Sequence, residues 1–176
     1  GKTAVLVGVG RIAEELARRC RVFDMTVMGV STRKSASNFD AIFPRARLAE
    51  AAGKADFLIV LTPYTEENHH LIDAAVIAAM KPEGVLINLA RGGVLDEEAL
   101  RKALVAGRIA GAGLDVFQTE PLPPESPLWD TPNLLITSHV GGVSENYTEQ
   151  VMPLLIDNLR AFLAGAPERM RYIVKF

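Results

Sequence analysis

Residues 3–20 read TAVLVGVGRIAEELARRC, and this stretch decides the predicted fold. It opens with a short aliphatic run, which is typical of a strand that is buried on both faces of a parallel sheet. A glycine-rich turn, GVGRIA at 8–13, follows directly, and residues 11–21 then show the apolar spacing of an amphipathic helix. A strand, a glycine turn and a helix in this order predict an anion-binding site at the N-terminus of the helix.

The glycine turn has a suitable residue at each position of a dinucleotide-binding motif. Gly8 suits the tight turn, Gly10 lets the backbone approach a pyrophosphate closely, and Ala13 takes the third small position. Arg11 and Ile12 lie between them, in the first turn of the helix, and we expect both to contact the cofactor. The motif alone is weak, because glycines between a strand and a helix are often only structural.

The rest of the chain repeats the alternation of strand and helix. Five more aliphatic runs are found at 25–31, 56–62, 84–90, 109–117 and 133–140. Further candidate helices are found at 46–53, 66–80, 96–107 and 144–164. This alternation predicts an α/β fold, a Rossmann-type doubly wound parallel sheet with helices on both faces. Because 176 residues, nearly half of them hydrophobic, suffice for one core, we expect one domain.

Single residues predict where helices and loops begin and end. Asp96 suits the start of a helix, where its carboxylate can accept free N–H groups, and Gly107 suits the end of that helix. Pro153 should kink the last helix or restart it with Pro153 at its first position. Segment 118–132 holds five of the ten prolines and is predicted to be a loop between the fifth and sixth strands, at the edge where open α/β sheets bind ligands.

Composition and charge disfavour several classes of partner. The formal net charge of −2 gives no excess of cations for binding nucleic acid or an anionic membrane, and the apolar runs are too short to span a bilayer. Cys20 is the single cysteine, so an internal disulfide is excluded and we expect a cytoplasmic protein. His69 and His70 are adjacent, so on a helix their side chains diverge, and we predict no metal site.

The end of the second predicted strand indicates which dinucleotide is bound. An acidic residue is expected there to bond the ribose 2′-hydroxyl of NAD(H), but GVSTRK at 29–34 has none. Ser31 and Thr32 offer neutral hydroxyls, and Arg33, next to Lys34, can bind a 2′-phosphate through a charged fork. We therefore predict that NADP(H) is preferred and that NAD(H) is possible. The alternative is that both cations are only solvated residues of a turn.

Four polar residues follow the later strands, at positions that a purely structural account does not require. Arg91 follows the fourth run, Asp115 and Glu120 follow the fifth, and His139 follows the sixth. The carboxyl ends of parallel strands share one edge of a sheet, so we expect these side chains to converge near the glycine turn. Taken singly, each residue also has a structural explanation as a turn cap, a solvated loop residue or a hydrogen-bonded histidine.

The order and spacing of the motifs resemble a known family. GVGRIA is followed by TPYT at 62–65, NLARGGVLDEEAL at 88–100, LDVFQTEPLP at 114–123 and TSHVGG at 137–142. In this combination the chain is similar to the nucleotide-binding domain of the D-isomer-specific 2-hydroxyacid dehydrogenases. STRK at 31–34 and SPLW at 126–129 most resemble the glyoxylate and hydroxypyruvate reductases within that family. The resemblance implies hydride transfer between NADP(H) and a small 2-keto or 2-hydroxy acid.

The resemblance also implies roles for individual residues. Arg91 would polarise the substrate carbonyl and bind the substrate carboxylate, and His139 would be the acid/base with Glu120 as its partner. Asp115 would lie on the nicotinamide side. The remaining cofactor contacts that it implies are Thr62, Pro63, Ala90 and Gly141. These residue types suit the reaction, because reduction of a keto acid builds negative charge on an oxygen that a proton donor and a cation stabilise.

Some features depart from the family or extend beyond this chain. Ser138 stands where proline is usual, and Asn68 replaces a common threonine, which would weaken a phosphate contact. The resemblance runs from residue 2 to about residue 165, and it implies one dinucleotide-binding domain at 1–165 and a two-fold homodimer. Family members also carry a second domain that closes over the substrate. The tail at 166–176, with Tyr172, Ile173, Val174 and Phe176, is expected to return to that domain, so the domain by itself should be nearly inactive.

Two alternative functions remain open at this stage. The first is a non-catalytic module with the same fold that senses nucleotides or binds proteins. The second is a different Rossmann-type oxidoreductase, for example one that acts on amino acids.

Overall fold

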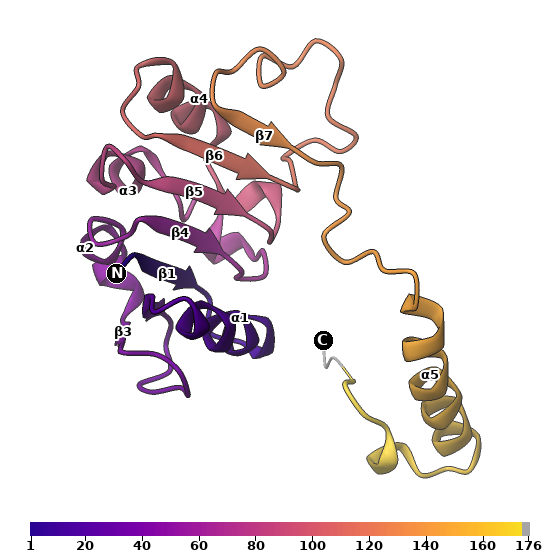
Figure 1. Ribbon diagram of the computed structural model, residues 1–176. Coiled ribbons are helices and arrows are strands. Elements are labelled where there is room, and N and C mark those ends of the chain that lie inside the picture. The colour runs from indigo at the N-terminus through magenta and orange to yellow at the C-terminus, as the bar shows by residue number, and fades with distance from the viewer. Residues whose placement is uncertain (174–176) are drawn as a thin grey trace. The chain divides into compact units, whose positions relative to one another are not determined.

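The computed structural model describes residues 1–173, which belong to two compact units, Gly1–His139 and Val140–Phe176. The first unit contains a seven-stranded sheet in the order β3-β2-β1-β4-β5-β6-β7, and every neighbouring pair of strands is parallel. The chain starts in the middle of the sheet and builds strands outward on both sides of β1 (Figure 1). This arrangement confirms the predicted doubly wound α/β fold.

The strands and helices are short and mostly regular. The strands are β1 Thr3–Val7, β2 Thr26–Val30, β3 Ala41–Phe43, β4 Phe57–Val60, β5 Val85–Asn88, β6 Gly111–Leu114 and β7 Leu134–Ile136. The α-helices are α1 Arg11–Val22, α2 Leu48–Ala52, α3 Ala74–Ala79, α4 Glu97–Val105 and α5 Tyr147–Leu163. Short 3-10 turns are η1 Arg45–Arg47, η2 Glu66–Asn68, η3 Gly92–Val94 and η4 Pro167–Arg169.

The central strand shows why the sheet is covered on both faces. Successive side chains of a strand point to opposite faces, so Leu6 and Val7 belong to different layers. Ala4 and Leu6 pack in one cluster with the small residues of α1, whereas Val5 and Val7 pack in a second cluster with residues of α2, α3 and α4. Residues 4–7 are almost completely buried, which explains their continuous aliphatic sequence.

One observed strand was not predicted, and one predicted helix is wrong in part. β3 at Ala41–Phe43 was not expected, because three residues before Pro44 give too short a pattern to be recognised. The predicted helix 66–80 was wrong over its first half, since only Ala74–Ala79 is α-helical after η2. Ile72 instead bonds the backbone on both sides, because its N–H donates to Val94 and its carbonyl accepts from Asp96. Asp73 then caps α3 by accepting from the Val76 N–H.

Most of the other local predictions were confirmed, and one alternative was wrong. Asp96 caps α4 by accepting from the Ala99 N–H at 2.9 Å, and Gly107 follows that helix with φ +63. Segment 118–132 contains neither a helix nor a strand. Pro153 lies inside a continuous α5, so the alternative of a new helix that begins at Pro153 was wrong.

The second unit contains α5 and η4, and the segment 170–173 follows η4. Asn158 on α5 holds that segment, because its side-chain amide bonds both the N–H and the carbonyl of Arg171 at 2.9 Å. Of the four tail residues named above, Tyr172 and Ile173 are exposed, and Val174 and Phe176 lie outside the described residues. Within residues 1–173, no helix combines the length and the apolar character that a membrane span requires.

Candidate active site

The glycine turn between β1 and α1 has the geometry that a bound pyrophosphate needs. Gly8 has φ +97, and a Cβ atom on it would lie 2.8 Å from the backbone nitrogen of Thr62, so only glycine fits. Gly10 precedes α1 without a side-chain cap, and a Cβ atom on it would meet no atom within 4 Å. The N-terminus of α1 therefore opens onto free space, where its N–H groups and its dipole can receive an anion.

The loop after β2 is folded back onto this turn. Ser31 Oγ accepts the backbone N–H of Arg33 at 3.1 Å, which fixes the start of the loop. The Arg33 guanidinium donates through Nη1 to the carbonyl of Val9 at 3.2 Å and to Oε1 of Glu14 at 2.8 Å. Arg33 is thus held beside the glycine turn although its side chain is half exposed, and Thr32 and Lys34 lie next to it on the surface.

A cleft of about 1010 Å³ lies at the carboxyl ends of the strands. Seven of the residues that the sequence singled out line it: Ile12, Thr62, Pro63, Ala90, Arg91, Glu120 and His139. Tyr64, His69 and Gln118 line it as well, and no role was predicted for them. His69 stands edge-on to the Tyr64 ring with 6.0 Å between ring centres, so both rings form one wall of the cleft. The available signal was that Tyr64 lies within the TPYT turn and that His69 follows this turn closely.

Glu120 and His139 form a direct pair inside this cleft. His139 Nδ1 lies 2.8 Å from Glu120 Oε2, and the other carboxylate oxygen, Oε1, accepts the N–H of Phe117 at 2.9 Å. These hydrogen bonds, first the one with His139, hold the pKa of Glu120 below its usual value, and the positive charge of Arg91 acts in the same direction. His139 has φ +56, a backbone conformation that is uncommon outside glycine and that recurs at functional sites.

A buried asparagine positions Arg91. Asn88 ends β5 and is completely buried, which is unusual for an amide side chain. Its Oδ1 accepts the N–H of Ala90 at 3.0 Å, and its Nδ2 donates to the carbonyl of Arg91 at 3.1 Å. These two bonds fix the turn that carries the guanidinium into the cleft. This role was not predicted, although one amide side chain within an aliphatic run is a visible signal in the sequence.

Close packing joins the Arg91 turn to the loop that carries Glu120. A Cβ atom on Gly92 would lie 1.8 Å from the carbonyl carbon of Phe117 and 2.2 Å from the backbone nitrogen of Gln118. Only a glycine lets these two stretches of backbone touch. The backbone segments that carry Arg91 and Glu120 are therefore packed directly against each other, although they follow different strands.

Not every predicted cofactor residue lines this cleft. Asp115 lines a neighbouring cavity of about 560 Å³, which shares Leu89 with the first one, and it accepts a hydrogen bond from Thr137 Oγ1 at 2.5 Å. Gly141 belongs to the second compact unit. Within residues 1–173, no group of three His, Cys, Asp or Glu side chains is arranged to hold a metal ion.

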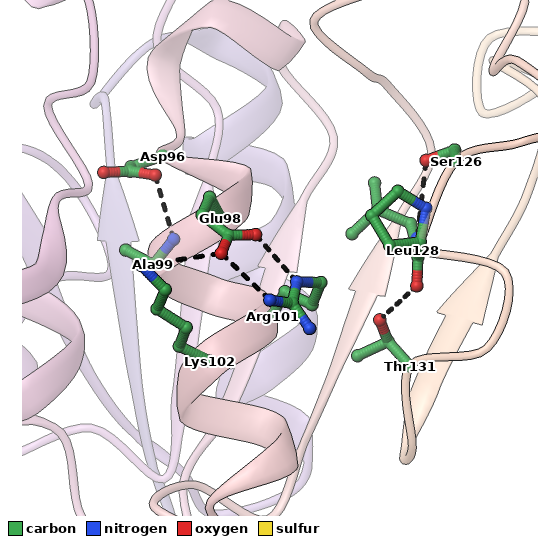
Figure 2. A network of polar contacts seen from close by, with 9 residues as sticks. Asp96, Glu98, Ala99, Arg101, Lys102, Ser126, Leu128 and Thr131 are labelled. Atoms are coloured by element: carbon green, nitrogen blue, oxygen red, sulfur yellow. Dashed lines mark hydrogen bonds and ion pairs between the residues drawn. The ribbon is translucent and has the colours of Figure 1, made fainter.

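The start of α4 anchors the loop before Glu120. Figure 2 shows Asp96 bonded to the Ala99 N–H, and Glu98 paired with Arg101 and Lys102 on the outer side of the helix. Glu97, between them in sequence, accepts the backbone N–H of Gln118 at 2.6 Å. Burial raises the pKa of Glu97 above its ordinary value of 4.5, and the nearby charge of Glu120 adds to this effect.

The raised pKa of Glu97 predicts a pH-dependent effect on stability. Its contribution to stability is fully present below the unfolded value of about 4.5, and it is lost as the pH rises through the folded value, because the folded state must then hold a desolvated carboxylate. Glu97→Gln cannot ionise but keeps an oxygen that accepts from Gln118. Its free energy of unfolding, relative to the unchanged protein, should therefore rise between about pH 4 and about pH 7 in urea titrations.

Glu98→Gln is the matched control for this measurement. Its hydrogen bond with Arg101 lowers the pKa of Glu98 to about 2. The stability that this carboxylate contributes is present above the unfolded value of about 4.5 and is lost as the pH falls toward 2. The free energy of unfolding of Glu98→Gln, relative to the unchanged protein, should therefore fall as the pH rises from about 2 to about 4.5 and stay nearly level from there to about pH 7. If the relative free energies of unfolding of the two variants changed with pH in the same direction, the raised pKa of Glu97 would be contradicted.

Several known proteins have sequences similar to that of this chain. The family model described as D-isomer specific 2-hydroxyacid dehydrogenase, NAD binding domain, matches residues 1–141. Glyoxylate/hydroxypyruvate reductase B of Pectobacterium carotovorum subsp. carotovorum is 42% identical over 166 residues, which cover 93% of this chain and 52% of that protein. Glyoxylate reductase of Pyrococcus furiosus is 40% identical over 166 residues, which cover 94% and 49%. The chain thus spans about half the length of these relatives.

Solved structures show the same fold. The NADPH-dependent glyoxylate/hydroxypyruvate reductase of Sinorhizobium meliloti, in complex with NADP and sulfate, matches with a TM-score of 0.86 and 30% identity and covers 99% of this chain and 55% of that one. A D-isomer specific 2-hydroxyacid dehydrogenase of Xanthobacter autotrophicus Py2, in complex with NADPH and MES, has a TM-score of 0.84 and 33% identity over 94% and 68% of the two chains.

Proposed function

This chain belongs to the D-isomer specific 2-hydroxyacid dehydrogenase family, and from that membership we propose that it is the dinucleotide-binding half of a reductase. The reaction would transfer a hydride between NADP(H) and a small 2-keto or 2-hydroxy acid such as glyoxylate or hydroxypyruvate. One observation carries this proposal: a paired imidazole and carboxylate share a cleft with a guanidinium, at the strand ends that also hold the glycine turn.

The proposed roles follow from the charge that develops during reduction. The nicotinamide, when bound, supplies the hydride. Arg91 would bind the substrate carboxylate and stabilise the growing negative charge on the carbonyl oxygen. His139 would donate a proton from its Nε2 to that oxygen, because Nδ1 is engaged with Glu120. Glu120 would orient the imidazole through the contact at Nδ1, so that Nε2 faces the substrate.

The proposed preference for NADP(H) is supported by the charge at the end of β2. Ser31, Thr32 and Lys34 bring no negative charge that would repel a 2′-phosphate, and Arg33 is held beside the glycine turn. The Sinorhizobium and Xanthobacter proteins were solved with NADP and NADPH. For this chain, NADP(H) is the preferred cofactor in the proposal and NAD(H) is a weaker one.

Arg33→Ala is expected to weaken NADPH binding about 10- to 100-fold, the cost of losing hydrogen bonds to a charged phosphate. NADH lacks the 2′-phosphate, so its affinity should stay within about twofold. Calorimetric titration of both dinucleotides into this chain measures the effect. Arg18→Ala is the control, because Arg18 is an exposed cation of α1 that pairs with Glu15 instead. Tighter binding of NADH than NADPH by the unchanged chain would contradict the proposed preference.

Further parts of the proposal concern the whole protein. Because the chain spans about half of its relatives, we propose that a second, substrate-binding domain completes the site and excludes water from it. Residues 140–165 would belong with the dinucleotide-binding domain, and the tail at 166–176 would return to the substrate domain. A homodimer and a cytoplasmic location also remain proposals.

A further inference from the structure

We propose that Glu14 is a positioning residue for Arg33, which it holds so that one edge of the guanidinium stays available for the 2′-phosphate of NADP(H). This inference rests on the proposed binding of NADP(H) by this domain. It assigns to Glu14 a share in the discrimination between the two dinucleotides, which differ only in that phosphate. Glu14 follows Ala13, the last position of the dinucleotide-binding motif, so no role was predicted for it from the motif.

The hydrogen bonds of Arg33 are distributed unevenly over its guanidinium. Nη1 carries two hydrogens, and the two acceptors that it meets are the carbonyl of Val9 at 3.2 Å and Oε1 of Glu14 at 2.8 Å. In the part of the chain that the structure describes, Nε and Nη2 of Arg33 donate to no protein acceptor. The protein therefore occupies one nitrogen and leaves the Nε–Nη2 edge to a ligand.

That free edge has the geometry that phosphate recognition uses. Nε–H and one Nη2–H are parallel donors, and together they can bind two oxygens of one phosphate. A long, exposed arginine samples many rotamers, and each contact that holds it before the ligand arrives lowers the ordering cost of binding. Val9 and Glu14 provide such contacts from the glycine turn and from the first turn of α1, which place the guanidinium next to the site of the pyrophosphate.

The charge of Glu14 has two opposite effects on a 2′-phosphate. It repels the phosphate through space, and it attracts the guanidinium that binds the phosphate. The first effect is weakened by solvent, since the Glu14 side chain is about one-third exposed. The second acts through a direct contact of 2.8 Å. The positive end of the α1 dipole also favours a carboxylate in this turn. The contact therefore outweighs the repulsion, and removal of Glu14 should weaken NADPH binding.

The test is a set of paired titrations of this chain with NADPH and NADH. Glu14→Ala should weaken NADPH binding about 3- to 10-fold and leave NADH within about twofold. Glu14→Gln retains an oxygen that accepts from Nη1, so it should recover at least half of that loss on the logarithmic scale. Glu15→Ala is the matched control, because Glu15 is the next residue of α1 and pairs with Arg18 and Arg19. The control should leave both affinities unchanged.

Parallel measurements separate this inference from the proposed function. If Arg33→Ala leaves NADPH binding unchanged, the proposed cofactor preference fails. If Arg33→Ala weakens NADPH binding but Glu14→Ala leaves it unchanged or tightens it, the role of Glu14 alone is overturned. In the double variant, loss of Glu14 should add no further effect, because both residues act on the same phosphate. Far-ultraviolet circular dichroism verifies that the variants keep their helical content. If Glu14→Ala weakened the binding of NADPH and NADH equally, its role would be merely structural and the inference would be overturned.

Discussion

Replacing His139 by alanine is expected to slow the reduction of glyoxylate by NADPH about 10²- to 10⁴-fold, in a protein that carries this domain together with its substrate domain. The substitution removes the proposed proton donor and leaves the Glu120 carboxylate without the imidazole 2.8 Å away. NADPH affinity should change little, because the glycine turn and Arg33 lie on other strand ends. Steady-state rates at saturating NADPH, together with a titration of cofactor binding, measure both quantities.

Glu120→Gln refines this experiment. Its amide oxygen can still accept the N–H of Phe117, but the carboxylate oxygen that lies 2.8 Å from His139 Nδ1 is replaced by an amide group. The rate should therefore fall less than for the alanine variant at His139, because the imidazole remains but loses the carboxylate that orients it. Full turnover by the His139 variant would refute the proposed proton donor. A protein that binds partners or nucleotides but turns over no keto acid, with or without His139, would support the sensing module instead.

Gly92→Ala is expected to have the largest effect on stability. The added methyl group would lie 1.8 Å from the Phe117 carbonyl carbon and 2.1 Å from its oxygen. Backbone atoms cannot rotate away as a side chain does, so the Arg91 turn or the Glu120 loop must shift. We expect the free energy of unfolding to fall by about 3 kcal/mol, at the upper end for an overpacked site. Urea unfolding followed by circular dichroism measures this change.

Gly113→Ala is the matched control for Gly92→Ala. Gly113 lies in β6, and a Cβ atom on it would meet nothing within 4 Å. Its substitution should leave stability unchanged or raise it slightly, because alanine loses less conformational entropy on folding than glycine does. If the two alanine variants unfold at the same urea concentration, the close approach of the two loops is not required for the fold.

The fold was predictable where a pattern extended over many residues. The aliphatic runs at β1, β4 and β5 each fill a buried parallel strand, and the spacing after Gly10 matches α1. The failures have local causes. β3 has only three residues, which is too short to show an alternating or continuous apolar pattern. The apolar residues before α3 lie in an extended segment, whose backbone forms hydrogen bonds with residues 93–96 instead of a helical turn. Such pairing between distant segments leaves no local signal in the sequence.

The sequence predicted the titratable side chains of the candidate site, but it did not predict the residues that position them through hydrogen bonds. Arg91, Glu120 and His139 follow strand ends in a parallel sheet, so their meeting in one cleft follows from topology. Asn88 and Glu97 act through hydrogen bonds to backbone groups, and such contacts depend on the path of the chain in three dimensions. Residue type alone could not reveal those partners. The pairing of Arg33 with Glu14 crosses from a loop to a helix and was hidden for the same reason.

The strand order has a practical consequence for altering this protein. β2, which carries the residues proposed to choose the dinucleotide, lies on one side of β1, and the strands that carry Arg91, Glu120 and His139 lie on the other side. The two groups of loops are thus separately exchangeable parts. Grafting an acidic β2 loop from an NADH-dependent relative should change the preferred dinucleotide of the proposed reductase from NADP(H) to NAD(H) and leave the proposed roles of Arg91, Glu120 and His139 in place.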